Sequence, residues 1–169
     1  LQIGTTPNKN LNRLIEALGG LKVTLVVVGR LDDAIISRID ELGIALANYV
    51  DLDDGDLVRE YRKADMVVFV STYEGFGMPI IEAQAVGRPV LTSNICSMPE
   101  AAGGAACLVD PFDVEDIRRG VCRLLDDPGY CQQLVERGYE NAARYSPEKI
   151  AEQYAVIYRK IHEAQGVSS

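Results

Sequence analysis

The chain has 169 residues, of which 47% are hydrophobic and 25% are charged, and its formal net charge is −8 at pH 7. This length and composition are typical of one globular domain with a core of its own. An acidic chain with scattered Lys and Arg residues is a poor match for a nucleic-acid surface, and no apolar run reaches the roughly 18 residues of a membrane-spanning helix.

Short runs rich in valine, isoleucine and leucine recur along the chain and predict buried strands. The clearest are residues 23–28 and 66–70, whose lack of polar alternation suits a parallel sheet covered on both faces. Residues 1–4 resemble the end of another strand. Weaker strands are expected at residues 45–50, 90–92 and 106–109.

Segments with helical spacing of apolar residues separate these strands. They comprise residues 11–18, about 35–42, 54–63, 79–86, 114–125, 128–145 and a last helix from residue 146. The alternation predicts one α/β domain over residues 1–169, built as a doubly wound, Rossmann-like parallel sheet. Ligands of such sheets bind outside the carboxyl ends of the strands, so the turns after the strands carry the functional information.

The turn after the strand at residues 66–70 is the most informative. Its sequence, Glu74-Gly-Phe-Gly-Met78, leads into a helix expected to begin at Pro79, and Glu82 is expected in the first turn of that helix. Unpaired backbone N–H groups at a helix N-terminus attract anions and sugar hydroxyls. A single glutamate there is ordinarily dipole compensation, but two glutamates around a glycine-rich turn favour a ligand site.

The same stretch resembles the Glu-x7-Glu motif of group 1 glycosyltransferases, which are retaining, nucleotide-sugar-dependent enzymes with the GT-B fold. The resemblance extends over YRKADMVVFVSTYEGFGMPIIEAQAVGRPVLTSN (61–94), GTTPNKNLNRLIEAL (4–18) and SMPEAAGGAACLVDP (97–111). It implies that the chain is the C-terminal, donor-binding half of such an enzyme, with the N-terminal acceptor domain absent from the chain.

The resemblance also implies roles for individual residues. Glu74 would hold a donor-sugar hydroxyl and the charge that develops at the anomeric carbon, Lys9 would neutralise the departing diphosphate, and Glu82 would bind the ribose hydroxyls. The other implied donor-binding residues are Gly4, Thr5, Gly29, Arg30, Val50, Leu52, Leu57, Gly75, Phe76, Gly77 and Met78. Fixed dipoles and one lysine can stabilise a diphosphate, so no metal or other cofactor is expected.

One departure from the family concerns the phosphate clamp. Many members carry an arginine shortly before the lysine, whereas this chain has Gly4, Thr5 and Thr6 in that region. Arg30 is a candidate replacement, and a surface charge without function is the alternative.

Other chemically suggestive residues have structural interpretations. The aspartates of residues 51–56 are expected to cap a helix rather than bind a cation. The four cysteines lack metal-ligand spacing and are expected to be buried, reduced thiols, and His162 is not expected to act as a base.

The sequence therefore predicts the donor domain of a hexosyltransferase of polysaccharide biosynthesis, with a nucleotide-sugar donor, a saccharide or lipid-linked acceptor and no nucleic-acid partner. We expect the chain alone to be inactive, with its last helix packed partly against the other half. The expected location is cytoplasmic, with membrane association through the other half left open. A nucleotide-sugar epimerase of the same fold and a non-catalytic, receiver-type binding module are the alternatives.

Overall fold

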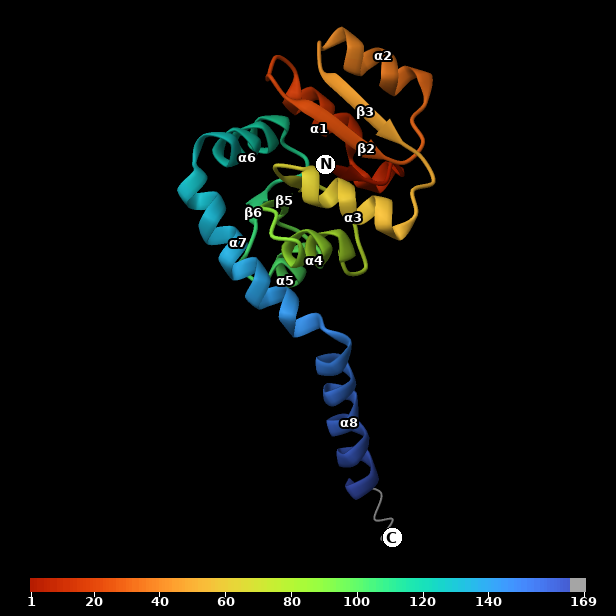
Figure 1. Cartoon of the computed structure of the whole chain (residues 1–169), viewed down its shortest axis with the longest axis vertical. Helices are drawn as coiled ribbons and strands as arrows, with labels where there is room; N and C mark the ends of the chain where they lie inside the picture. Colours follow the sequence, from red (N-terminus) through yellow and green to blue (C-terminus); the bar gives the residue numbers. More distant parts are fainter. Residues whose placement is uncertain (165–169) are drawn as a thin grey trace.

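A computed structural model describes residues 1–164 and shows the expected alternation of strands and helices (Figure 1). The strands are β1 (Gln2–Ile3), β2 (Thr24–Val28), β3 (Ala45–Tyr49), β4 (Val67–Phe69), β5 (Val90–Ser93) and β6 (Cys107–Val109). The helices are α1 (Leu11–Leu18), α2 (Asp33–Glu41), α3 (Asp54–Lys63), α4 (Met78–Ala85), α5 (Met98–Ala102), α6 (Val114–Asp126), α7 (Pro128–Ala142) and α8 (Pro147–Ala164). Two short 3-10 turns, Pro7–Lys9 and Ala143–Tyr145, precede α1 and α8.

The strands form two parallel, three-stranded sheets, β1-β2-β3 and β4-β5-β6. Hydrogen bonds at Leu1 connect the two: its amino group donates to the Met66 carbonyl (2.9 Å), and its carbonyl accepts from the Val68 N–H (2.9 Å). The spatial order is therefore β3-β2-β1-β4-β5-β6. This is the doubly wound arrangement, in which the order of successive strands reverses between β1 and β4. Such folds bind ligands at this point of reversal.

Two hydrophobic clusters cover the two faces of the sheet. Alternate residues of the β4 segment divide between them: Val68 and Val70 belong to one cluster, and Val67 and Phe69 to the other. The first cluster contains the predicted apolar face of α1 together with residues of α2 and α6, and the second contains residues of α3, α4 and α5. Burial on both faces explains why the β4 sequence has no polar alternation.

The structure differs from the sequence-based expectation in three places. A short helix, α5, lies where a turn was expected, because Pro99 can occupy the first turn of a helix. Helix α4 begins at Met78, one residue before the predicted start at Pro79. The predicted helix 128–145 ends at Ala142 and continues as a 3-10 turn.

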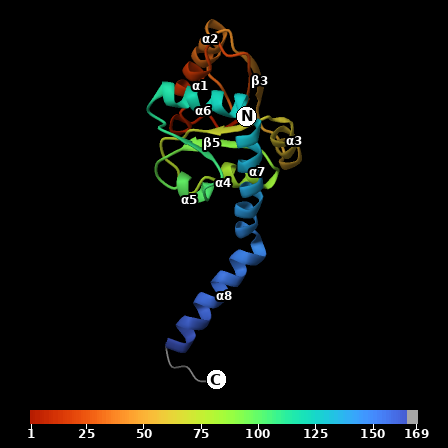
Figure 2. The same cartoon turned by 90° about the vertical axis from the view of Figure 1, so that its left-hand side faces the viewer.

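Helix α8 extends away from the body of the domain (Figures 1 and 2). Tyr154, Ile157, Tyr158 and Ile161 recur at the spacing of one helix face, and all four are exposed. Among the helices of residues 1–164, none has the length and apolarity required to cross a membrane.

Candidate functional site

The turn after β1 and the turn after β4 lie against each other at the reversal point of the sheet. The Thr72 N–H donates to the Asn8 carbonyl (2.8 Å), and the Asn8 side-chain amide donates to the Tyr73 carbonyl (3.0 Å) and to Glu74 Oε1 (3.2 Å). Two turns separated by more than 60 residues in sequence thus form one surface at the carboxyl ends of the central strands.

Lys9 and Glu74 form an ion pair at the centre of this surface. Lys9 Nζ lies 2.7 Å from Glu74 Oε1, and the side chains are only 18% and 15% exposed. The Lys9 ammonium also lies 4.5 Å from the centroid of the buried Phe69 ring. The two residues that the family resemblance marks as catalytic are therefore adjacent, in a half-buried position where a charge interaction is screened less than on an open surface.

Gly4 and Gly29 shape the turn that carries Lys9. A Cβ atom at Gly4 would lie 3.1 Å from Lys9 Cε, so the missing side chain leaves room for the lysine stem. Gly29 has a φ of +140°, and a Cβ atom there would approach Thr5 Cγ2 to 2.9 Å. Both glycines thus allow close packing of this turn, whatever contacts they make with a ligand.

The glycine-rich turn before α4 is open to solvent. Gly75 and Phe76 are exposed, and Gly77 adopts a φ of +106° as the N-cap of α4. Within the described residues, the backbone N–H groups of residues 75–78 donate to no protein acceptor. The positive end of α4 therefore presents free donors beside Glu74, as the sequence predicted.

The structure corrects the local setting of Glu82. Because α4 begins at Met78, Glu82 is its fifth residue, and the first turn of the helix contains no acidic residue. The prediction that Glu82 lies in the first turn was therefore wrong. Its Oε2 instead accepts a hydrogen bond of 2.6 Å from the Tyr61 hydroxyl on α3, a contact with no signal in the local sequence.

The predicted base-binding residues lie at the end of β3 and in α3. Val50 is exposed, Leu52 is half-buried, and Leu57 packs against the core cluster that contains Tyr61. The Asp53 carboxylate accepts from the Asp56 N–H, which confirms the predicted cap for Asp53; Asp54 and Asp56 lie in the first turn of α3 and are not caps. The contacts of Val50, Leu52 and Leu57 with a nucleotide base remain predictions.

The candidate replacement arginine lies in the turn after β2. Arg30 is 85% exposed, and its Nη2 is 3.8 Å from Asp51 Oδ2, a pair that contributes little in water. Arg30 also lines a cavity of about 240 Å³ together with Thr5 and Thr6. Its role as a phosphate clamp stays a prediction.

Asn10 and Ser97 hold the turns in place, and sequence reasoning missed both. The buried Asn10 side-chain amide donates to the Val70 carbonyl (3.0 Å) and to the Pro111 carbonyl (2.7 Å), so it connects the turns after β1, β4 and β6. The Ser97 hydroxyl donates to the Glu74 carbonyl (2.9 Å). The only local signal was the position of both residues at carboxyl ends of strands.

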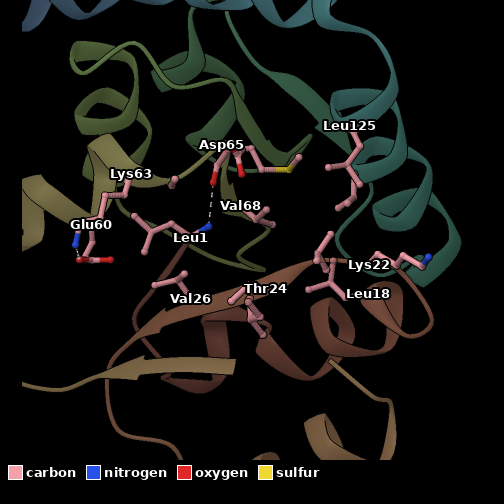
Figure 3. A pocket seen from close by; sticks show the side chains of 15 residues that line it. Leu1, Leu18, Lys22, Thr24, Val26, Glu60, Lys63, Asp65, Val68 and Leu125 are labelled. Atoms are coloured by element: carbon pink, nitrogen blue, oxygen red, sulfur yellow. Dashed lines mark hydrogen bonds and ion pairs between the residues drawn. The ribbon is translucent and has the colours of Figure 1, made fainter. Parts of the chain in front are cut away.

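A second cavity, of about 450 Å³, opens at the opposite edge of the sheet (Figure 3). Leu1, Thr24 and Met66 contribute to its wall, and they lie at the amino ends of β1, β2 and β4. Ligands of doubly wound sheets bind at the other edge, so we do not assign the functional site to this cavity.

Comparison with known proteins identifies the family of the chain. The family model described as "Glycosyl transferases group 1" matches residues 4–141. The chain belongs to this family. It corresponds to the C-terminal domain of a group 1 glycosyltransferase with the GT-B fold.

Three similar proteins illustrate the relationship. O-antigen chain mannosyltransferase B from Escherichia coli is 34% identical over 94% of this chain and 45% of its own length. Sucrose-phosphate synthase from Thermosynechococcus elongatus has a TM-score of 0.81 and 26% identity over 94% of this chain and 43% of that one. HepE from Anabaena, solved with UDP and glucose, has a TM-score of 0.78 and 21% identity over 90% of this chain and 46% of its own. The group 1 domain thus spans less than half the length of these proteins.

Proposed function

We propose that this group 1 domain binds a nucleotide-diphosphate sugar and supplies the donor side of a retaining glycosyl transfer. The observation that carries the proposal is the Lys9–Glu74 pair, with an Nζ–Oε1 distance of 2.7 Å, at the reversal point of the sheet and beside the free N–H groups before α4. The likeness to HepE, whose structure contains UDP and glucose, supports the class of donor.

Each part of this surface has a distinct task in the proposed reaction. The Lys9 ammonium and the N-terminal dipole of α4 stabilise the negative charge on the diphosphate as the bond to the sugar breaks. The Glu74 carboxylate accepts from a sugar hydroxyl and stabilises the positive charge that develops at the anomeric carbon. Glu82 accepts from the ribose hydroxyls and thereby orients the nucleotide.

Mannose is the first donor sugar to test, because a relative with 34% identity is a mannosyltransferase of an O-antigen chain. The acceptor, a saccharide or a lipid-linked sugar, is bound in this proposal by a domain outside the chain. The exposed apolar face of α8 packs against that domain, which gives Tyr154 and Ile157 a partner. Transfer then requires both domains, and the present chain by itself binds donor without transferring sugar.

Binding is tested by calorimetry of UDP, GDP and ADP with the wild-type chain and with Glu82→Ala. Binding of one nucleotide that weakens in Glu82→Ala supports the proposal, and Glu152→Ala on the exposed α8 is the matched control, with unchanged affinity expected. Failure of the wild type to bind any of the three would instead favour a non-catalytic binding module.

Transfer is tested in the full-length protein with a nucleotide-diphosphate mannose and a saccharide acceptor. NMR of the product should show the anomeric configuration of the donor sugar. Inversion of that configuration would contradict a retaining reaction. Conversion of the donor to another nucleotide sugar without transfer would indicate an epimerase.

A further inference from the structure

Tyr61 joins the core of the domain to the site. Its side chain is only 2% exposed and belongs to the same hydrophobic cluster as Phe69 and Ile80. The ring therefore has little freedom to move, and the position of its hydroxyl is fixed by packing. That hydroxyl donates to Glu82 Oε2 at 2.6 Å, a short distance typical of a hydrogen bond to a charged acceptor.

The local sequence explains how Tyr61 comes to this position. Leu57 and Tyr61 are four residues apart on α3, so both side chains lie on one face of the helix, and Leu57 packs against the same cluster. The Asp53 side chain caps the start of α3. The ring of Tyr61 packs in the cluster, and its hydroxyl, at the far end of the ring, reaches the half-buried Glu82.

The hydrogen bond leaves part of the carboxylate unused. Within the described residues, Glu82 Oε1 has no protein hydrogen-bond donor, whereas Oε2 is held by Tyr61. Burial, together with the adjacent carboxylate, raises the pKa of Tyr61 far above its usual value. The phenol therefore keeps its proton at every working pH and acts as a donor to Glu82, which retains lone pairs for a ligand.

We propose that Tyr61 is a positioning residue for donor binding, which holds the Glu82 carboxylate in the orientation that accepts from the 2′- and 3′-hydroxyls of a ribose. The inference rests on the proposed function, since it assigns Glu82 to the ribose. It adds a residue that never touches the ligand: Tyr61 restricts the side-chain torsions of Glu82 before the nucleotide arrives. A site arranged in advance to accept from hydroxyls discriminates strongly against a ligand that lacks them.

A purely structural role for Tyr61 makes a different prediction. If the tyrosine only filled the core, Tyr61→Phe would retain the ring that fills it. The affinity for all nucleotides would then change equally or not at all. If it positions Glu82, the loss must depend on the ribose hydroxyls. The test therefore compares a ribonucleoside diphosphate with its 2′,3′-dideoxy counterpart, using whichever of UDP, GDP and ADP the wild-type chain binds.

Calorimetric titration of the wild type and of Tyr61→Phe provides the measurement. We expect Tyr61→Phe to weaken ribonucleotide binding by about 5- to 10-fold, the magnitude of one hydrogen bond, and to leave dideoxynucleotide binding within about twofold. In a Glu82→Ala background, which removes the acceptor, Tyr61→Phe should have little further effect, because the two residues act through one contact. Tyr158→Phe, on the exposed α8, is the matched control and should bind as the wild type does.

The hydroxyl can also be retained while the ring is altered. A chain with 3-fluorotyrosine at position 61 keeps the donor and should keep the wild-type preference for the ribonucleotide, so it serves as the rescue and as a second variant if Tyr61→Phe is too unstable to titrate. Loss of the preference in the fluorotyrosine chain would contradict the proposal. Circular dichroism and denaturant unfolding of each variant show that the fold is retained.

The outcomes separate this inference from the proposed function. Ribonucleotide binding by Tyr61→Phe equal to that of the wild type, or an equal loss for both nucleotides, would overturn the role of Tyr61 and leave the donor site standing. Absence of any nucleoside diphosphate binding by the wild-type chain would overturn both.

Discussion

Lys9 Nζ and Glu74 Oε1 are 2.7 Å apart although 65 residues separate them in sequence. The cation proposed to receive a diphosphate is therefore paired with the carboxylate proposed to receive a sugar. A nucleotide sugar that binds here must break this ion pair, because its diphosphate competes with Glu74 for the Lys9 ammonium and its sugar hydroxyls compete with Lys9 for the Glu74 carboxylate.

Glu74→Gln should therefore separate nucleotide binding from transfer. Removal of the carboxylate releases Lys9 and removes a negative charge near the diphosphate, so we expect nucleoside diphosphate affinity to rise by roughly fivefold, or about 1 kcal/mol. Transfer by the full-length protein should fall by at least about 100-fold, because the developing charge at the sugar loses its partner. Calorimetry and a transfer assay measure the two effects, and a fall in nucleotide affinity would contradict the competition.

Lys9→Met should weaken nucleoside diphosphate binding by roughly 10- to 150-fold, which corresponds to the 1.5–3 kcal/mol of a hydrogen bond to a charged group. Methionine retains most of the apolar stem that lies over Gly4, so the variant removes mainly the ammonium. Calorimetry gives the affinity. Lys149→Met, an exposed lysine of α8, is the control, and an equal loss in both variants would show that only the net charge matters.

Asn10 should stabilise the fold in two independent ways: it tolerates a left-handed backbone conformation, and its side-chain amide donates two hydrogen bonds. Its φ of +60° is unfavourable for most residues, and its amide donates to the buried Val70 and Pro111 carbonyls. Asn10→Gly keeps the backbone conformation but leaves the Val70 and Pro111 carbonyls without a donor. We expect this to lower the free energy of unfolding by roughly 2–4 kcal/mol. Asn10→Ala adds about 1 kcal/mol of backbone strain. Denaturant unfolding should give the order wild type, Asn10→Gly, Asn10→Ala, and the reverse order of the two variants would disprove the backbone contribution.

Gly75 and Gly77 form a matched pair in the turn before α4. Gly77 has a φ of +106°, and a Cβ atom there would lie 3.1 Å from Ile80 Cδ1, whereas a Cβ atom at Gly75 would meet nothing within 4 Å. We expect Gly77→Ala to lower the free energy of unfolding by about 1–3 kcal/mol and Gly75→Ala to change it by less than about 0.5 kcal/mol. Thermal or denaturant unfolding measures both values, and equal losses would mean that the conformation of Gly77 is not the cause.

Most of the fold was predictable because its signals are local. The apolar run of β4 and the four-residue spacing of Leu57 and Tyr61 depend only on neighbouring residues, and the structure confirms both. The boundaries were less accurate. Met78 extends α4 by one residue because the N-cap role falls to Gly77, whose positive φ the sequence does not reveal. Because of this shift, Glu82 lies beyond the first turn of α4. Compensation of the helix dipole therefore no longer explains a glutamate at this position.

The sequence alone determined the order of strands and helices and, through its motifs, the family; it also predicted that a ligand would bind at the carboxyl ends of the strands. Only the tertiary structure decided which side chains meet there: Lys9 with Glu74, Tyr61 with Glu82, and Asn10 with the carbonyls of two other turns. The reason is physical. Secondary structure depends on dihedral preferences and burial patterns within a few residues, whereas each of these contacts depends on how separate strands end beside one another after the whole sheet has formed.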